Sequence, residues 1–257
     1  MKKSPVFVIV VLLSIFITSC SLLEETVFNK DGSINYSFTL DSSSLMGMMP
    51  DSVSNGKDSP RFLRDTVISF ADIIEELKDS IAALPPAEQE KFEAMKPFNI
   101  KSHFDQEKKE FFLQMFGKFD NVSALNKAIS NLETVRKNLS KEKDKKLSLS
   151  PTESGYESLT HSLSKAQIKW DGKFLKKTIV PANYDSPEID KDSLQTDIWL
   201  FSGGFKSVYK FPKKVKSVSG STALLSQDGK TVIVNYDLQE YLTYPEKANI
   251  EIELEDE

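Results

Sequence analysis

Ser33-Ile34-Asn35-Tyr36-Ser37-Phe38-Thr39-Leu40-Asp41 alternates polar and apolar residues without interruption. Successive side chains of an extended chain point to opposite faces, so Ile34, Tyr36, Phe38 and Leu40 share one face. The opposite face is polar and suits contact with water. This stretch therefore predicts a β-strand with one buried face, and it decides the fold class because the rest of the chain must pair with it and cover it.

The residues before this stretch supply its first partner. Leu22 to Phe28 is predicted to be a strand, and Asp31-Gly32 follows it as a turn signal. Two strands joined by a tight turn form an antiparallel hairpin. A second hairpin is predicted further along the chain, with strands over Ile100–Asp105 and Glu110–Asp120 and a charged tip between them.

Helical periodicity appears in two regions. Apolar residues at steps of three, four and seven predict one helix face, formed by Phe70, Ile73, Ile74, Leu77, Ile81 and Leu84. Ser69 and Asp72 offer a capping pair at its start, and Pro86 can begin a second short helix that ends at Met95. A further amphipathic helix is predicted from Val122, Leu125, Ile129, Leu132 and Val135, with Asp120 or Asn121 as its cap.

The C-terminal part is rich in strand signals. Strands are expected at Ile168–Trp170, Phe174–Val180, Phe205–Phe211, Thr222–Leu225, Thr231–Tyr236 and Ile250–Leu254, with Asp171-Gly172 and Asp228-Gly229 as hairpin turns. The whole pattern predicts an α+β fold, in which antiparallel β-hairpins form a sheet packed with two or three amphipathic helices. Residues 140–158 are lysine- and serine-rich and are expected to be a mobile linker or a long exposed loop. One domain over residues 20–257 is favoured over two lobes.

The N-terminus carries a targeting signal. Lys2 and Lys3 precede an apolar run over residues 6–17 that is shorter than the ~20 residues a membrane span needs. The segment ends in Ile17-Thr18-Ser19-Cys20, which resembles the lipobox of bacterial lipoproteins. The resemblance implies that residues 1–19 are a signal peptide and that Cys20 is acylated and anchors the protein to the membrane. An ordinary cleaved signal peptide is the alternative.

The residues after the cysteine bear on location. Ser21 stands where an aspartate would mark inner-membrane retention, so the resemblance implies an outer-membrane lipoprotein that faces either the periplasm or the cell surface. Glu24-Glu25 weakly resembles the acidic export tags of Bacteroidota lipoproteins. A wider resemblance, to uncharacterised Bacteroidota envelope lipoproteins, rests on Asp31-Gly32-Ser33 and on residues 211–218 followed by Asp228-Gly229-Lys230. This chain departs from the wider group at Lys213, where a glycine is common, and the resemblance carries no site residues.

Composition excludes some functions. Cys20 is the only cysteine among 257 residues, so its acylation leaves no thiol for a disulfide. Hydrophobic residues make up 39% of the chain, which is enough for a folded core. The net charge of −5 argues against nucleic acid as a partner, because nucleic acid requires a basic face.

Candidate catalytic residues are few. The chain has two histidines, His103 and His161, and neither lies in a nucleophile motif, although His103 and Asp105 are placed to share a strand face. The separation of the histidines argues against a zinc site of the usual kind. The glycine-rich segment Ser202-Gly203-Gly204-Phe205 lacks the spacing and the lysine of a phosphate loop. The sequence therefore predicts no enzyme and no cofactor.

Two binding hypotheses remain. Four acidic residues could offer oxygen ligands to calcium, although a solvated acidic loop is favoured: Asp185, Glu188, Asp190 and Asp192. Seven aromatic residues could line a glycan- or lipid-binding cleft, although a place in the core is favoured: Trp170, Phe174, Trp199, Phe201, Phe205, Tyr209 and Phe211. The leading prediction is a lipid-anchored, non-enzymatic module that binds an envelope protein or an apolar ligand. A glycan-binding or glycan-processing lipoprotein and a lipid carrier with an apolar cavity are the alternatives.

Overall fold

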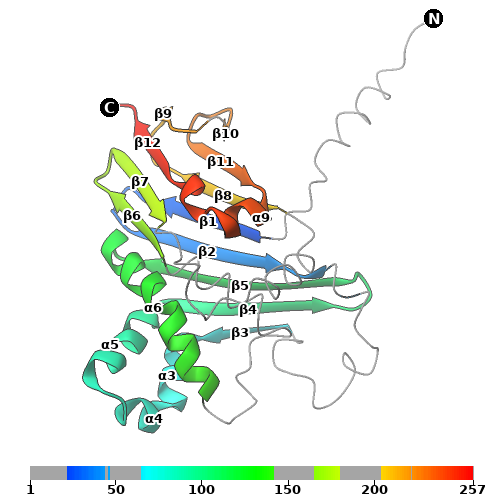
Figure 1. The fold of residues 1–257 in the computed structure, drawn as a ribbon, viewed down its shortest axis with the longest axis vertical. Helices are drawn as coiled ribbons and strands as arrows, with labels where there is room; N and C mark the ends of the chain where they lie inside the picture. Colours follow the sequence, from blue (N-terminus) through cyan, green and yellow to red (C-terminus); the bar gives the residue numbers. More distant parts are fainter. Residues whose placement is uncertain are drawn as a thin grey trace, which may run out of the picture.

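A computed structural model describes residues 22–43, 46, 65–141, 165–179, 204–220 and 222–256. Two β-sheets and several helices make up this part of the chain (Figure 1). The predicted α+β class is confirmed, with one difference, because the hairpins form two sheets rather than one. The predicted signal peptide over residues 1–19 lies outside the described residues, and so does most of the predicted loop over 140–158.

The larger sheet has eight strands in the order β10-β11-β8-β1-β2-β5-β4-β3. Their bounds are β1 Leu22–Phe28, β2 Ile34–Asp41, β3 Thr66–Ser69, β4 Phe98–Asp105, β5 Glu110–Phe119, β8 Phe205–Lys210, β10 Ala223–Leu225 and β11 Thr231–Tyr236. The pairing is antiparallel except between β1 and β8, which run parallel. The predicted hairpins β1–β2, β4–β5 and β10–β11 are all present in this sheet.

The smaller sheet has four strands in the order β6-β7-β12-β9, all antiparallel. Their bounds are β6 Ala166–Trp170, β7 Phe174–Ile179, β9 Val215–Val218 and β12 Ile250–Leu254. The predicted turn at Asp171-Gly172 joins β6 to β7. Gly172 has a φ of +96°, a backbone conformation that glycine adopts readily and that strains a residue with a Cβ atom.

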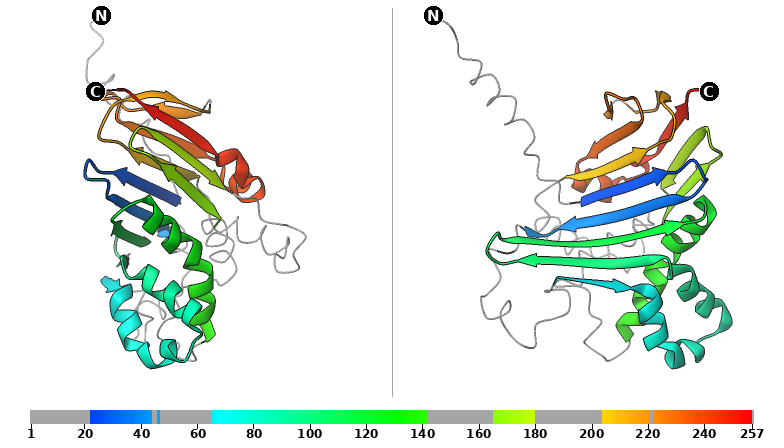
Figure 2. Two further views of the ribbon diagram at one scale, coloured as in Figure 1. Left: turned by 90° about the vertical axis from the view of Figure 1, so that its left-hand side faces the viewer. Right: turned by 180° about the vertical axis from the view of Figure 1, so that it is seen from behind.

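Helices lie at the β3 side of the large sheet and over its inner face (Figure 2). Their bounds are α3 Phe70–Glu76, α4 Lys78–Ala82, α5 Pro86–Met95, α6 Val122–Lys141 and α9 Leu238–Thr243, and the 3-10 helix η5 spans Pro245–Ala248. The single helix predicted over residues 70–84 is divided by a turn at Leu77 into α3 and α4. Ser69 caps α3 by accepting a hydrogen bond from the Ala71 N–H, as expected. Helix α6 continues to Lys141, so residues 140 and 141, predicted to belong to the loop, are helical.

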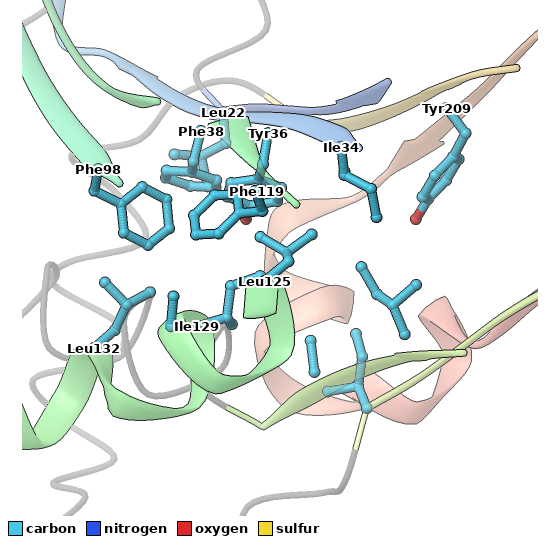
Figure 3. Close-up of a cluster of buried hydrophobic side chains, with 14 of the residues drawn as sticks. Leu22, Ile34, Tyr36, Phe38, Phe98, Phe119, Leu125, Ile129, Leu132 and Tyr209 are labelled. Atoms are coloured by element: carbon cyan, nitrogen blue, oxygen red, sulfur yellow. The ribbon is translucent and has the colours of Figure 1, made fainter. Parts of the chain in front are cut away.

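The core lies between the large sheet and a second layer made of α6 and the small sheet. The predicted inward face of β2 is confirmed, because Ile34, Tyr36, Phe38 and Leu40 are all at most 6% exposed. Figure 3 shows Ile34, Tyr36 and Phe38 directed toward the second layer, and Leu125, Ile129 and Leu132 of α6 point back at the sheet. Buried residues of both sheets and of the helices form one hydrophobic cluster.

Each helix in the described part of the chain is too short or too polar to cross a bilayer.

Candidate functional site

The most unusual feature of the core is a charged residue on the central strand β1. Alternation along β1 buries Leu22, Glu24, Thr26 and Phe28, so the side chain of Glu24 points between the two sheets. Only 1% of Glu24 is exposed. A buried carboxylate is costly unless it is paired and accepts hydrogen bonds. The position of Glu24 therefore requires partners from the facing layer.

The principal partner is Lys177 of β7, which is also 1% exposed. Its Nζ forms an ion pair with Glu24 Oε2. Two hydroxyls donate to the same carboxylate, Tyr36 OH to Oε1 at 3.2 Å and Ser207 Oγ to Oε2 at 3.0 Å. Lys177 Nζ also lies 5.8 Å from the ring centroid of Tyr209, within cation–π range. Residues from both sheets thus meet at one buried point.

Buried hydroxyls without a hydrogen bond also lie in this core. Thr26 Oγ1, Tyr209 OH and Tyr241 OH find no hydrogen-bonding partner among the residues the structure describes. Such groups are rare in folded proteins because each forfeits its bonds to water. The cluster therefore holds more polar groups than the ion pair itself uses.

The low polarity of the core governs the protonation of the cluster. Burial raises the pKa of Tyr36, Tyr209 and Tyr241, and the nearby Glu24 carboxylate adds to the rise. Burial alone would lower the pKa of Lys177, but Glu24 together with Tyr241 and Tyr236 outweighs it, and the net shift is upward. Lys177 thus keeps its charge and the tyrosines stay neutral over the physiological pH range.

A second group of polar residues lies on the outer face of β4 and β5. His103 Nδ1 is 2.9 Å from Asp65 Oδ1, and His103 Nε2 is 3.4 Å from Glu110 Oε2. Asp105 completes the group, since one ligand atom each from His103, Asp105 and Glu110 lie within 4.8 Å of one another. The expectation that His103 and Asp105 share a strand face is confirmed.

Many of the predicted site residues fall outside the described ranges. These are Cys20, His161, Asp185, Glu188, Asp190, Asp192, Trp199, Phe201, Ser202 and Gly203. Gly204 is described, and its carbonyl accepts a hydrogen bond of 3.2 Å from the Leu22 N–H at the start of β1. This end of the glycine-rich segment thus lies beside the start of β1.

The aromatic residues of the C-terminal part mostly fill the core. Phe205, Tyr209 and Phe211 are at most 6% exposed. Trp170 packs against Phe28 and Phe211, with ring centroids 4.7 and 5.7 Å apart. Among the described members of the predicted aromatic set only Phe174, at 39% exposed, is open to solvent. The place in the core that the sequence favoured is therefore confirmed for the buried members.

The ion pair itself was not predicted from the sequence. Glu24-Glu25 weakly resembles an acidic export tag at the surface. In the structure, however, the Glu24 side chain is buried in the core, and Glu25 forms an ion pair with Lys210 at 2.6 Å. The available signal was the alternation of β1, which places Leu22, Glu24 and Phe28 on one face. Leu23, Glu25 and Val27 make the other face almost equally apolar, so the pattern did not distinguish the two.

Comparison with known proteins adds one distant likeness. No protein-family model matches the chain. No curated protein matches it either. Among solved structures, the NMR structure of the folded domain of Mycobacterium tuberculosis LppM aligns over 93% of this chain and 92% of that chain, with 9% identity and a TM-score of 0.37. A likeness at this TM-score carries no argument about the function of the chain.

Proposed function

We propose that this protein is an envelope lipoprotein, acylated at Cys20, whose domain works as a binding module held directly against the membrane. The observation that carries the proposal is the short distance along the chain between Cys20 and the core. Leu22 is the first residue of β1 and only 1% exposed. Ser21 alone separates it from Cys20.

This spacing leaves almost no tether. Each residue spans at most about 3.6 Å, so the Cα atom of Cys20 lies within about 7 Å of that of Leu22. Leu22 is held on both sides, by Leu40 of β2 and by Phe205 of β8. An acyl chain on Cys20 would therefore bring the Leu22 end of the large sheet to the bilayer surface.

The sheet then has a membrane-proximal and a membrane-distal end. Leu22 is level with Leu40, Leu113 and Ser102 across the sheet, and the β4–β5 hairpin continues beyond this row to its tip at Gln106 (Figure 1). The opposite end of β1 leads into the turn at Lys30, about 20 Å further away at ~3.3 Å per strand residue. The hairpin tip would lie near the lipid headgroups and Lys30 far from them.

Binding rather than catalysis is supported by where the polar groups lie. Glu24 and Lys177 are sealed from solvent and face each other, so neither can reach a substrate without opening the core. Exposed aliphatic side chains occur instead on the outermost strands of the large sheet, namely Val67 of β3 and Leu224 and Leu225 of β10. Edge strands are where another chain can add a strand, which suits an envelope protein as partner.

The glycan and lipid-carrier alternatives remain predictions from the sequence. The aromatic side chains that suggested glycan binding are mostly core residues. The interior between the sheets contains an ion pair, which is unfavourable surroundings for an apolar ligand.

Acylation of Cys20 leaves no other cysteine in the chain, so a cysteine introduced at a chosen position is the single site for a fluorescent label. First, metabolic labelling with a palmitate analogue and membrane fractionation of the wild type and Cys20→Ser test the anchor, with a density gradient to separate outer from inner membrane. Second, Gln106→Cys and Lys30→Cys each introduce a single reactive thiol for a fluorophore in vesicles containing quencher lipids. We expect stronger quenching at residue 106 than at residue 30.

Each arm has its own contradicting outcome. Membrane attachment that survives Cys20→Ser would remove the anchor from the proposal. Equal quenching at the two positions, with the anchor intact, would show that the domain is not held with its Leu22 end toward the bilayer. If the purified protein turned over a substrate and a single substitution abolished this activity, the protein would be an enzyme instead.

A further inference from the structure

The His103 group on the outer face of β4 has the arrangement of a metal site rather than of an ordinary ion pair. Its imidazole is partly shielded, with 24% of the side chain exposed, and it packs on the Phe112 ring at a centroid distance of 4.7 Å. Asp65 lies on one edge of the ring, at Nδ1, and Glu110 on the other, at Nε2. The two nitrogens thus face two different carboxylates.

We propose that His103 Nε2, Glu110 and Asp105 bind a first-row divalent cation such as Zn²⁺, with Asp65 positioning His103. The 2.9 Å distance from Nδ1 to Asp65 Oδ1 is that of an N–H···O hydrogen bond. Asp65 Oδ1 is itself fixed by the Phe104 N–H at 3.0 Å. With its proton on Nδ1, a neutral imidazole directs the Nε2 lone pair toward Glu110. A carboxylate behind a metal-bound histidine plays this orienting role in known sites.

The distance on the other side of the ring fits two ligands of one ion. Glu110 Oε2 is 3.4 Å from Nε2, longer than a good hydrogen bond. With metal–ligand bonds of about 2.0–2.2 Å in tetrahedral geometry, two ligand atoms are roughly 3.3–3.5 Å apart. The pair is therefore spaced for a shared cation without rearrangement of the strands.

Strand pairing supplies the third ligand. Asp105 and Glu110 are directly opposite each other in the β4–β5 ladder. Like charges in this position repel and destabilise a hairpin, and a divalent cation between them would relieve the repulsion. Imidazole and carboxylate together suit zinc and its neighbours in the first row. Three protein ligands leave one position for water.

Lys108 is the competitor for this site. Its Nζ lies 2.9 Å from Asp105 Oδ2, and its backbone N–H donates to Oδ1 at 3.0 Å. The Lys108 side chain is 68% exposed and can turn away into solvent. Removal of its charge should therefore strengthen metal binding, whereas a site made by unrelated surface groups would be indifferent to it.

The test is Zn²⁺ titration of the full mature lipoprotein in detergent after a chelator wash, followed by isothermal calorimetry and by competition with a chromophoric chelator. We expect one Zn²⁺ per chain. Asp65→Asn should weaken binding by about 10–100-fold, the range for loss of an orienting partner, and His103→Gln and Glu110→Gln by at least as much. Lys108→Gln should tighten it. His161→Gln, which removes the other histidine, is the matched control and should bind as the wild type does.

Several results of these titrations would contradict the proposed metal site. Unchanged affinity in His103→Gln, an equal loss in His161→Gln, or no saturation at one ion per chain would each overturn the site. Circular dichroism of every variant checks the fold. Lys108→Gln removes only an exposed charge, so weaker or unchanged Zn²⁺ affinity in this variant counts against the proposal even if His103→Gln unfolds.

Discussion

Glu24 of β1 and Lys177 of β7 form an ion pair between the two sheets, although 153 positions separate them in the sequence. Each is 1% exposed, and each is the principal counter-charge of the other. A buried ion pair adds little net stability over an apolar pair of the same size, but the loss of one partner leaves an uncompensated charge. The pair therefore fixes how the small sheet docks on the large one.

Removal of one partner should be far more harmful than removal of both. We expect Glu24→Gln or Lys177→Met alone to lower the free energy of unfolding by about 3–5 kcal/mol, and the double variant to recover most of this loss. Urea denaturation of the three variants measures the coupling. Lys176→Met is the control, since its 2.6 Å pair with Glu251 lies at the surface and should contribute about 0–1 kcal/mol. Additive losses in the double variant would rule out the coupling.

Loss of the hydroxyl should affect the stability of the protein differently at two tyrosines of this cluster, Tyr36 and Tyr241. Tyr36 OH donates to the Glu24 carboxylate, so Tyr36→Phe should cost about 1.5–3 kcal/mol, the range for hydrogen bonds to charged groups. Tyr241 OH has no such bond within the described part of the chain, so Tyr241→Phe should be neutral or stabilising. Thermal unfolding measures both. Equal destabilisation by the two substitutions would show that Tyr241 has a polar partner in solution.

Alkaline pH should unfold the protein through these tyrosines. Folding raises their pKa above the ordinary value of 10.0, so their contribution to stability is complete below about pH 10 and is lost as the pH rises above it. Lys177, whose pKa is also raised, loses its stabilising charge in the same direction. Each buried tyrosine should add a slope of up to about 1.4 kcal/mol per pH unit.

Urea denaturation between about pH 8 and about pH 12 measures this slope, and tyrosinate absorbance should appear together with unfolding. Tyr241→Phe removes one of the contributing groups and should make the dependence shallower. If tyrosinate absorbance develops while the protein is still folded, the cluster is accessible to solvent.

Local signals in the sequence account for much of the fold. Alternation identified β2, Asp-Gly turns identified the β6–β7 and β10–β11 hairpins, and helical spacing identified α6. The division at Leu77 was missed because the apolar face continues across it. The strands β3 and β9 were missed as well, since four residues without a turn signal beside them carry too little pattern.

Long-range pairing accounts for the rest. The parallel pairing of β1 with β8 joins segments about 180 residues apart, and no local signal specifies it. Glu24 faces the core because its register with β2 sets it opposite the buried Phe38, and the β8 pairing then brings Ser207 beside it. The His103 group was missed for a different reason. A zinc site was sought in the sequence only as two neighbouring histidines or a cysteine. This misses a site in which strand pairing brings carboxylates next to a single histidine.

One side chain also protects a sheet edge. Asn126 of α6 lies beside β6, the outermost strand of the small sheet, and its amide exchanges two hydrogen bonds with the Ile168 backbone, at 2.7 and 2.9 Å. The amide thus substitutes for the missing neighbouring strand. Asn126→Leu keeps a similar volume but leaves a backbone N–H and C=O of β6 unpaired, which should cost about 1–3 kcal/mol per unsatisfied group. Asn126→Asp can accept from the N–H but cannot donate to the carbonyl, so its cost should be intermediate.

Hydrogen exchange of the Ile168 amide is the sharpest measurement of this edge. In the wild type the amide should be protected almost as well as those in β7, because Asn126 closes the edge. Asn126→Leu should speed its exchange well beyond the effect on global stability, whereas Lys127→Ala, a neighbouring change that removes only a surface pair with Glu90, should not. Protection that persists in Asn126→Leu would mean that packing of α6, rather than the amide, covers the strand.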